Sequence, residues 1–109
     1  MTEVTDPVFL KTADRFRAIA TEAGMTNLVR ASQIFRPGEK GIHPLTHICN
    51  DHVRHDACHP ANDRLFMAGG YLGRAISLWS QGLTDLALHE LRHCDRWLDN
   101  LERVRGERN

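Results

Sequence analysis

The amino-acid sequence predicts an all-α protein, a small four- or five-helix bundle that ends in an antiparallel helical hairpin. Apolar residues recur at helical spacing along most of the chain, and no segment shows the strict apolar–polar alternation of a half-buried strand. Turn signals divide the 109 residues into pieces of helical length. This length, with 41% hydrophobic residues, predicts a single helical domain over 1–109.

The first two helices are predicted over residues 7–23 and 26–35. Asp6 can cap the first helix, and Pro7 suits its first position. Its apolar positions recur at i, i+4, i+7 and i+11, at Phe9, Ala13, Phe16 and Ala20. Gly24 ends it, Thr26 can cap the next helix, and Arg36-Pro37-Gly38 opens a loop.

A middle helix is predicted over residues 44–59, although its histidines and aspartates are weak helix formers. The helix over 62–80 has two apolar faces, which indicates contact on two sides, as in the central helix of a bundle. Ser80-Gln81-Gly82 forms a tight turn, and the last helix is predicted over 84–104. Its apolar face consists of Ala87, Leu91, Cys94, Leu98 and Leu101.

Charge and hydropathy exclude several classes of function. Lys and Arg together number 14, as do Asp and Glu, so no broad basic field favours nucleic acid. No apolar run approaches the ~20 residues of a membrane span, and the N-terminus does not resemble a leader peptide. Three cysteines is an odd number without the spacing of a disulfide framework. We therefore expect a soluble, cytoplasmic protein without membrane or nucleic-acid partners.

Potential metal ligands are crowded into two short stretches. Six of the seven histidines and all three cysteines lie within residues 47–59 and 89–94. Imidazole and thiolate are the side chains that bind zinc and similar transition metals. The sequence therefore predicts a metal site, with zinc as the default ion.

The predicted site lies between the middle helix and the last helix. On a helical wheel, one half of the ligand set falls on or beside the apolar face of the middle helix. The other half falls on or at the border of the apolar face of the last helix, except that His89 points further toward solvent. Glu90 falls near the middle of that second face, and a buried carboxylate needs a cation or a metal ion. The candidate ligands are Cys49, His52, Asp56 and His59 in the first half, and His89, Glu90, His93 and Cys94 in the second.

Two alternatives remain open for the same residues. Residues His89 to His93 match the His-Glu-x-x-His pattern of zinc-dependent hydrolases, in which the glutamate acts as general base. Otherwise the protein is a metal-free interaction module, and the second apolar face of helix 62–80 forms a homodimer or binds a partner. In that case the cysteines are core residues, and Glu90 pairs with a cation such as Arg74.

Three glycines stand in five residues of the helix over 62–80. In a hairpin that turns at 81–82, Gly70 lies opposite His93, so the sequence predicts that Gly69, Gly70 and Gly73 face the last helix. Each glycine costs up to about 1 kcal/mol against alanine in a helix. Close crossing of two helices is the expected compensation, and room for a ligand or ion beside Glu90 is the alternative.

Overall fold

The structure is a computed structural model that describes residues 6–35, 38, 41–55 and 60–107. Five helices and no strand occur in this described part, which confirms the all-α prediction. The helices are α1 (Pro7–Glu22), α2 (Thr26–Ser32), α3 (Pro44–His55), α4 (Pro60–Ser80) and α5 (Thr84–Glu107).

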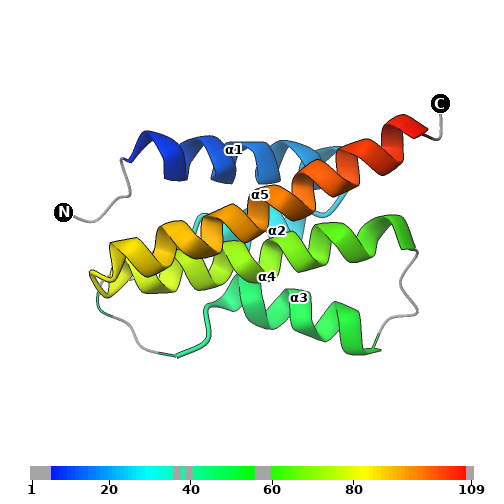
Figure 1. The fold of residues 1–109 in the computed structure, drawn as a ribbon. Coiled ribbons are helices and arrows are strands. Elements are labelled where there is room, and N and C mark those ends of the chain that lie inside the picture. The colour runs from blue at the N-terminus through cyan, green and yellow to red at the C-terminus, as the bar shows by residue number, and fades with distance from the viewer. Residues whose placement is uncertain (1–5, 36–37, 39–40, 56–59, 108–109) are drawn as a thin grey trace.

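Helix α4 lies at the centre and packs against all four of the others (Figure 1). Its largest contact is with α5, which runs antiparallel to it and confirms the predicted hairpin. The hairpin register agrees with the predicted one to within one residue, because the Tyr71 ring stacks on His93 with centroids 5.0 Å apart. Farther along, Arg64 Nε donates to Asn100 Oδ1 at 2.7 Å. Helix α4 is therefore the central helix of the bundle, as predicted.

The helix ends follow from local chemistry. Asp6 Oδ1 accepts hydrogen bonds from the amides of Val8 and Phe9, at 2.9 and 3.2 Å, and so caps α1 as predicted. Gly82 adopts a φ of 82° in the α4–α5 turn, a conformation that favours glycine. Helix α2 ends at Ser32 rather than at Phe35, because the Arg17 guanidinium binds both the carbonyl and the hydroxyl of Ser32.

Two glycines of α4 allow α3 to approach closely. A Cβ atom on Gly69 would collide with the Cys49 sulfur, and one on Gly73 would lie 2.7 Å from the backbone nitrogen of Thr46. By contrast, nothing lies within 4 Å of the position that a Cβ would take on Gly70. The prediction that these glycines serve the crossing with the last helix is therefore wrong. Gly69 and Gly73 instead serve the crossing with α3, because they lie one helical turn apart on the face that α3 covers.

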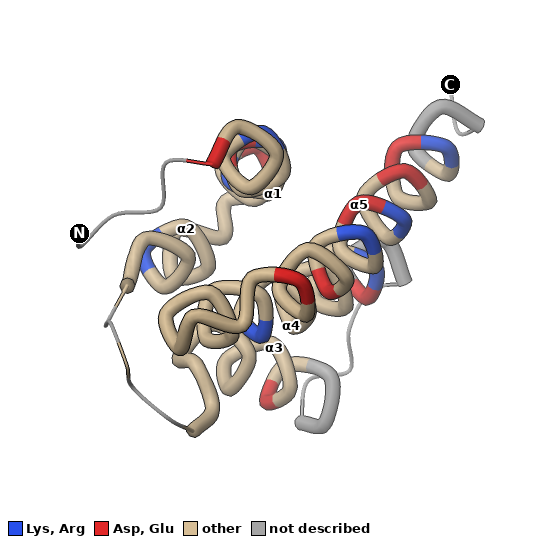
Figure 2. The backbone as a smooth tube through the Cα atoms, turned by 60° about the vertical axis from the view of Figure 1, so that its left-hand side comes forward, with Lys and Arg blue, Asp and Glu red and all other residues tan. Residues whose placement is uncertain are grey.

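Ion pairs join α1 to α5 at the surface. Arg15 bonds Asp99 at 2.6 Å, Glu102 at 3.1 Å and Asp95 at 3.4 Å. The Asp95 carboxylate also accepts a hydrogen bond from buried Thr12 at 3.0 Å. Figure 2 shows acidic and basic positions along α5, whereas α4 carries few. These charged contacts fix the rotation of α1 about its axis against the hairpin.

No helix in the described ranges is long and apolar enough to cross a lipid bilayer. The predicted homodimer through α4 stays a prediction.

The glycine contacts lead to opposite expectations for two neighbouring substitutions. Gly73→Ala forces the new methyl against the backbone of α3 and should lower the free energy of unfolding by about 1 to 3 kcal/mol. Gly70→Ala meets open space and should raise it by up to about 1 kcal/mol through helix propensity. Urea denaturation of both variants and the parent measures these changes. Equal stabilities of the two variants would contradict the crossing described above.

Candidate functional site: a histidine pair on α5

His89 and His93 form a pair on the surface of α5. They lie four residues apart, so both side chains project from one face of the helix. Their Nε2 atoms are 3.3 Å apart, and the two rings meet edge to face, with centroids separated by 4.8 Å. His89 is exposed and His93 is half-buried, which leaves the space beside the pair open to solvent.

The His93 ring is held from α4. Tyr71 stacks against it at an interplanar angle of 24°, and the Arg74 guanidinium lies 5.5 Å from the centroid of the same Tyr71 ring. The order of side chains across the hairpin is therefore His89, His93, Tyr71 and Arg74. Stacking restricts the orientation of His93, as a neighbouring group often does for a metal-binding imidazole.

Glu90 lies beside the pair and is half-buried between its helix and the core. Its Oε2 atom is buried and has no hydrogen-bond partner among the described residues. No ion pair joins Glu90 to Arg74 in the described structure, so the alternative in which these two side chains pair is wrong. A buried carboxylate oxygen without a partner is energetically unfavourable and calls for a proton or a cation.

The described ligands predicted on the middle helix lie on the other side of α4. Cys49 is buried against Gly69 and Phe16. The His52 ring stacks on Phe66 with centroids 4.5 Å apart, and its Nε2 atom lies 3.5 Å from the Asn27 amide of α2. These contacts direct His52 toward α2 and α4.

The structure does not bring the described ligands predicted on the middle helix together with those predicted on the last helix. Helix α4 lies between α3 and α5 (Figure 1). The described residues of α3 and α5 do not contact each other through their backbones. Among the described residues, no three His, Cys, Asp or Glu side chains are grouped to hold an ion. Asp56 and His59 lie outside the described residues. The single site that joins the two helices stays a prediction.

Both described cysteines are core residues. Cys49 is 1% exposed, and Cys94 is completely buried. Burial raises the pKa of the Cys49 thiol to about 12, and burial likewise raises the pKa of Cys94. Without a metal ion both thiols are therefore protonated well above neutral pH, and their predicted role as ligands stays a prediction.

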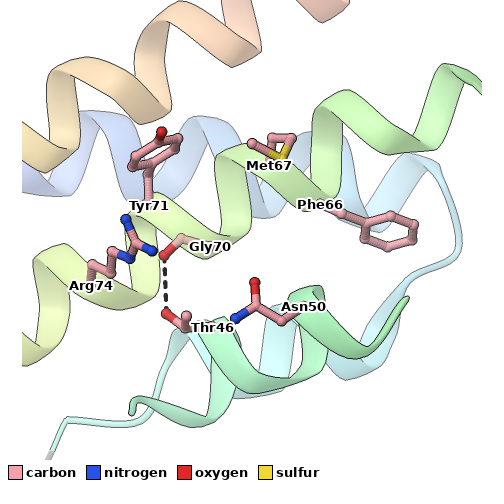
Figure 3. A pocket seen from close by; sticks show the side chains of 7 residues that line it. All are labelled: Thr46, Asn50, Phe66, Met67, Gly70, Tyr71 and Arg74. Atoms are coloured by element: carbon pink, nitrogen blue, oxygen red, sulfur yellow. Dashed lines mark hydrogen bonds between the residues drawn. The ribbon is translucent and has the colours of Figure 1, made fainter. Parts of the chain in front are cut away.

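A cleft opens between α3 and α4, next to Tyr71 (Figure 3). Its volume is about 220 Å³, and it contains residues that the sequence did not single out as ligands, chiefly Asn50 and Arg74. One signal was available for Arg74, because it is the only charged residue between Leu65 and Thr84. No comparable signal marked Asn50, since polar residues are common on the exposed face of a helix.

The Cys49 thiol predicts a loss of stability at alkaline pH. The folded-state pKa of the thiol is about 12, above the ordinary value of 9.0. The contribution of the buried neutral thiol to the free energy of unfolding is therefore complete below pH 9.0 and is lost as the pH rises toward 12. The limiting slope is about 1.4 kcal/mol per pH unit. Cys49→Ala should lower stability at neutral pH through lost packing, but its stability should fall less steeply above pH 9.0. Urea midpoints of both proteins across this range test the difference, and parallel curves would contradict it.

Comparisons with protein-family models, with curated proteins and with solved structures found no match for this chain. The fold alone also does not determine an activity, because small helical bundles support many unrelated functions. The function therefore has to be argued from the geometry of the site.

Proposed function

We propose that this protein is a small helical metal-binding protein, with zinc as the default ion, and that His89 and His93 supply the first two ligands. The observation that carries the proposal is the 3.3 Å separation of their Nε2 atoms. Two nitrogens that each lie about 2.0–2.1 Å from a tetrahedral zinc ion are about 3.3 Å apart. In the metal-free structure this separation is that of a hydrogen bond between the two rings, and an ion that replaces its proton would find two nitrogens at the spacing of zinc ligands.

Two further features support an ion at this place. The pair is accessible, because His89 is exposed, so an ion can reach it without unfolding the bundle. The unpartnered Oε2 of Glu90 lies on the same turn of α5, where a rotation of the side chain could bring the carboxylate to the ion. Water completes the coordination when protein ligands are fewer than four. Nitrogen and oxygen donors of this kind suit zinc, and they also bind copper and nickel.

The hydrolase alternative stays a prediction from the five-residue pattern. A zinc-dependent hydrolase of this kind needs three protein ligands, and no three candidate side chains are grouped among the described residues. For this reason we propose metal binding without a reaction.

The first test is zinc binding by the protein purified without a histidine tag. We expect His93→Ala to lower bound zinc to near background, because a single remaining imidazole cannot chelate the ion. His47→Ala is the matched control, since His47 is an exposed histidine on α3 outside the pair. Competition with a chromogenic chelator gives the affinities. Zinc binding that is equal in the two variants would exclude His93 as a ligand.

The second test asks whether Glu90 joins the site. If its carboxylate binds the ion, Glu90→Gln lowers the stabilisation that zinc gives, which amounts to about 2.7 kcal/mol at a free concentration one hundred times Kd. Without zinc the stability of the variant should change little, because glutamine keeps the shape of the side chain and removes only its negative charge. Denaturant midpoints of both proteins, with zinc and with a chelator, provide the four values needed. The same zinc-dependent increase in parent and variant would show that Glu90 is not a ligand.

A further inference from the structure

The cleft between α3 and α4 owes its open space to Gly70. Close helix contact explains Gly69 and Gly73, but Gly70 meets nothing within 4 Å of its potential Cβ position. Glycine weakens a helix relative to alanine, and no neighbouring atom requires the absence of a side chain here. Gly70 lines the cleft, so the missing side chain keeps about 220 Å³ accessible.

The walls of the cleft combine apolar surface with one positive charge. Met67 and Tyr71 supply a thioether and a ring, whereas the Phe66 ring at this cleft is 3% exposed and already stacks on His52. Arg74 supplies the charge, and no carboxylate of the described residues forms an ion pair with it. The Asn50 side chain points from α3 toward α4 at the same opening (Figure 3).

The hydroxyl of Thr46, a further polar group of the cleft, already forms a hydrogen bond within the protein. The Thr46 hydroxyl donates to the carbonyl oxygen of Gly70 at 3.0 Å, which ties α3 to α4 at one end of the cleft (Figure 3). Its oxygen can therefore accept a hydrogen bond from a ligand but has no second proton to donate. The side-chain donors that remain for an anion are the Arg74 guanidinium, the Asn50 amide and the Tyr71 hydroxyl.

This combination indicates the chemical class of the ligand. A guanidinium group binds a carboxylate through two parallel hydrogen bonds, and an apolar wall favours a hydrocarbon body. A phosphate is a poorer match, because the backbone amides here are held in helices and do not form a cradle for its oxygens. The volume is below that of sites for drug-sized molecules, so a ligand of one or two rings is the suitable size.

We propose that this cleft binds a small aromatic carboxylate, with the carboxylate on Arg74 and the ring against Met67 and Tyr71. The cleft is distinct from the histidine pair, although Tyr71 contacts both regions. Binding therefore does not depend on a metal ion and can be measured in the presence of a chelator. A failure of the proposed metal site would leave this inference unaffected.

The experiment compares benzoate with its uncharged analogue benzamide, with EDTA present, by titration of ¹⁵N-labelled protein. We expect the parent to bind benzoate at least about fivefold more tightly than benzamide, because a charge-assisted hydrogen bond adds roughly this much. The NMR resonances of the Asn50 side-chain amide and of Arg74 Nε should shift as benzoate is added. No saturable shift at these two groups, or equal affinities for the two compounds, would overturn the proposal.

Three variants locate the binding. Arg74→Gln should abolish the preference for benzoate while benzamide binding stays within about twofold. The matched control Arg103→Gln removes an exposed arginine of α5 and should bind as the parent does. Gly70→Leu fills the cleft and should weaken both compounds about tenfold or more, and its fold is checked by thermal melting. Parent-like selectivity in Arg74→Gln, or parent-like affinity in Gly70→Leu, would overturn the assignment of the ligand to this cleft.

Discussion

The close approach of α3 to α4 is the contact on which much of the remaining structure depends. At Gly69 and Gly73 the surface of α4 lacks the side chains that would otherwise hold α3 away, so Cys49 and Thr46 lie directly against the α4 backbone. The Thr46 hydroxyl then reaches the carbonyl of Gly70. Protein interiors are packed nearly as densely as crystals, so a single added methyl at such a contact has to displace a neighbour.

This approach also determines the chemistry of the groups around it. Cys49 is buried beneath the crossing, and the loss of solvent raises the pKa of its thiol to about 12. Gly70 lies between the two contact points, and the space above it remains open as the cleft. Gly69 contacts the buried thiol and its neighbour Gly70 borders the accessible cleft, because neighbouring residues of a helix face different directions.

Tyr71 connects the two regions of functional interest. One side of its ring stacks on His93, which belongs to the proposed metal site. The residue also lines the cleft, and its ring lies beside the Arg74 guanidinium. The two proposed sites lie on neighbouring surfaces of the helical hairpin and share a rigid aromatic side chain. Each can nevertheless be tested separately, because the ligands of one site are absent from the other.

The sequence by itself determined the five helices, the hairpin register to within one residue, and which face of each helix is apolar. It placed Glu90 on the apolar face of the last helix and His89 toward solvent. In the structure Glu90 is half-buried with a buried Oε2 atom, and His89 is exposed. These features depend on the period of the helix and on local turn residues. Only the tertiary structure decided which helix covers each face. A helical wheel shows that Cys49 and Cys94 are both buried, but it cannot show that α4 lies between α3 and α5 or that Gly70 borders a cleft, because those depend on contacts between distant segments.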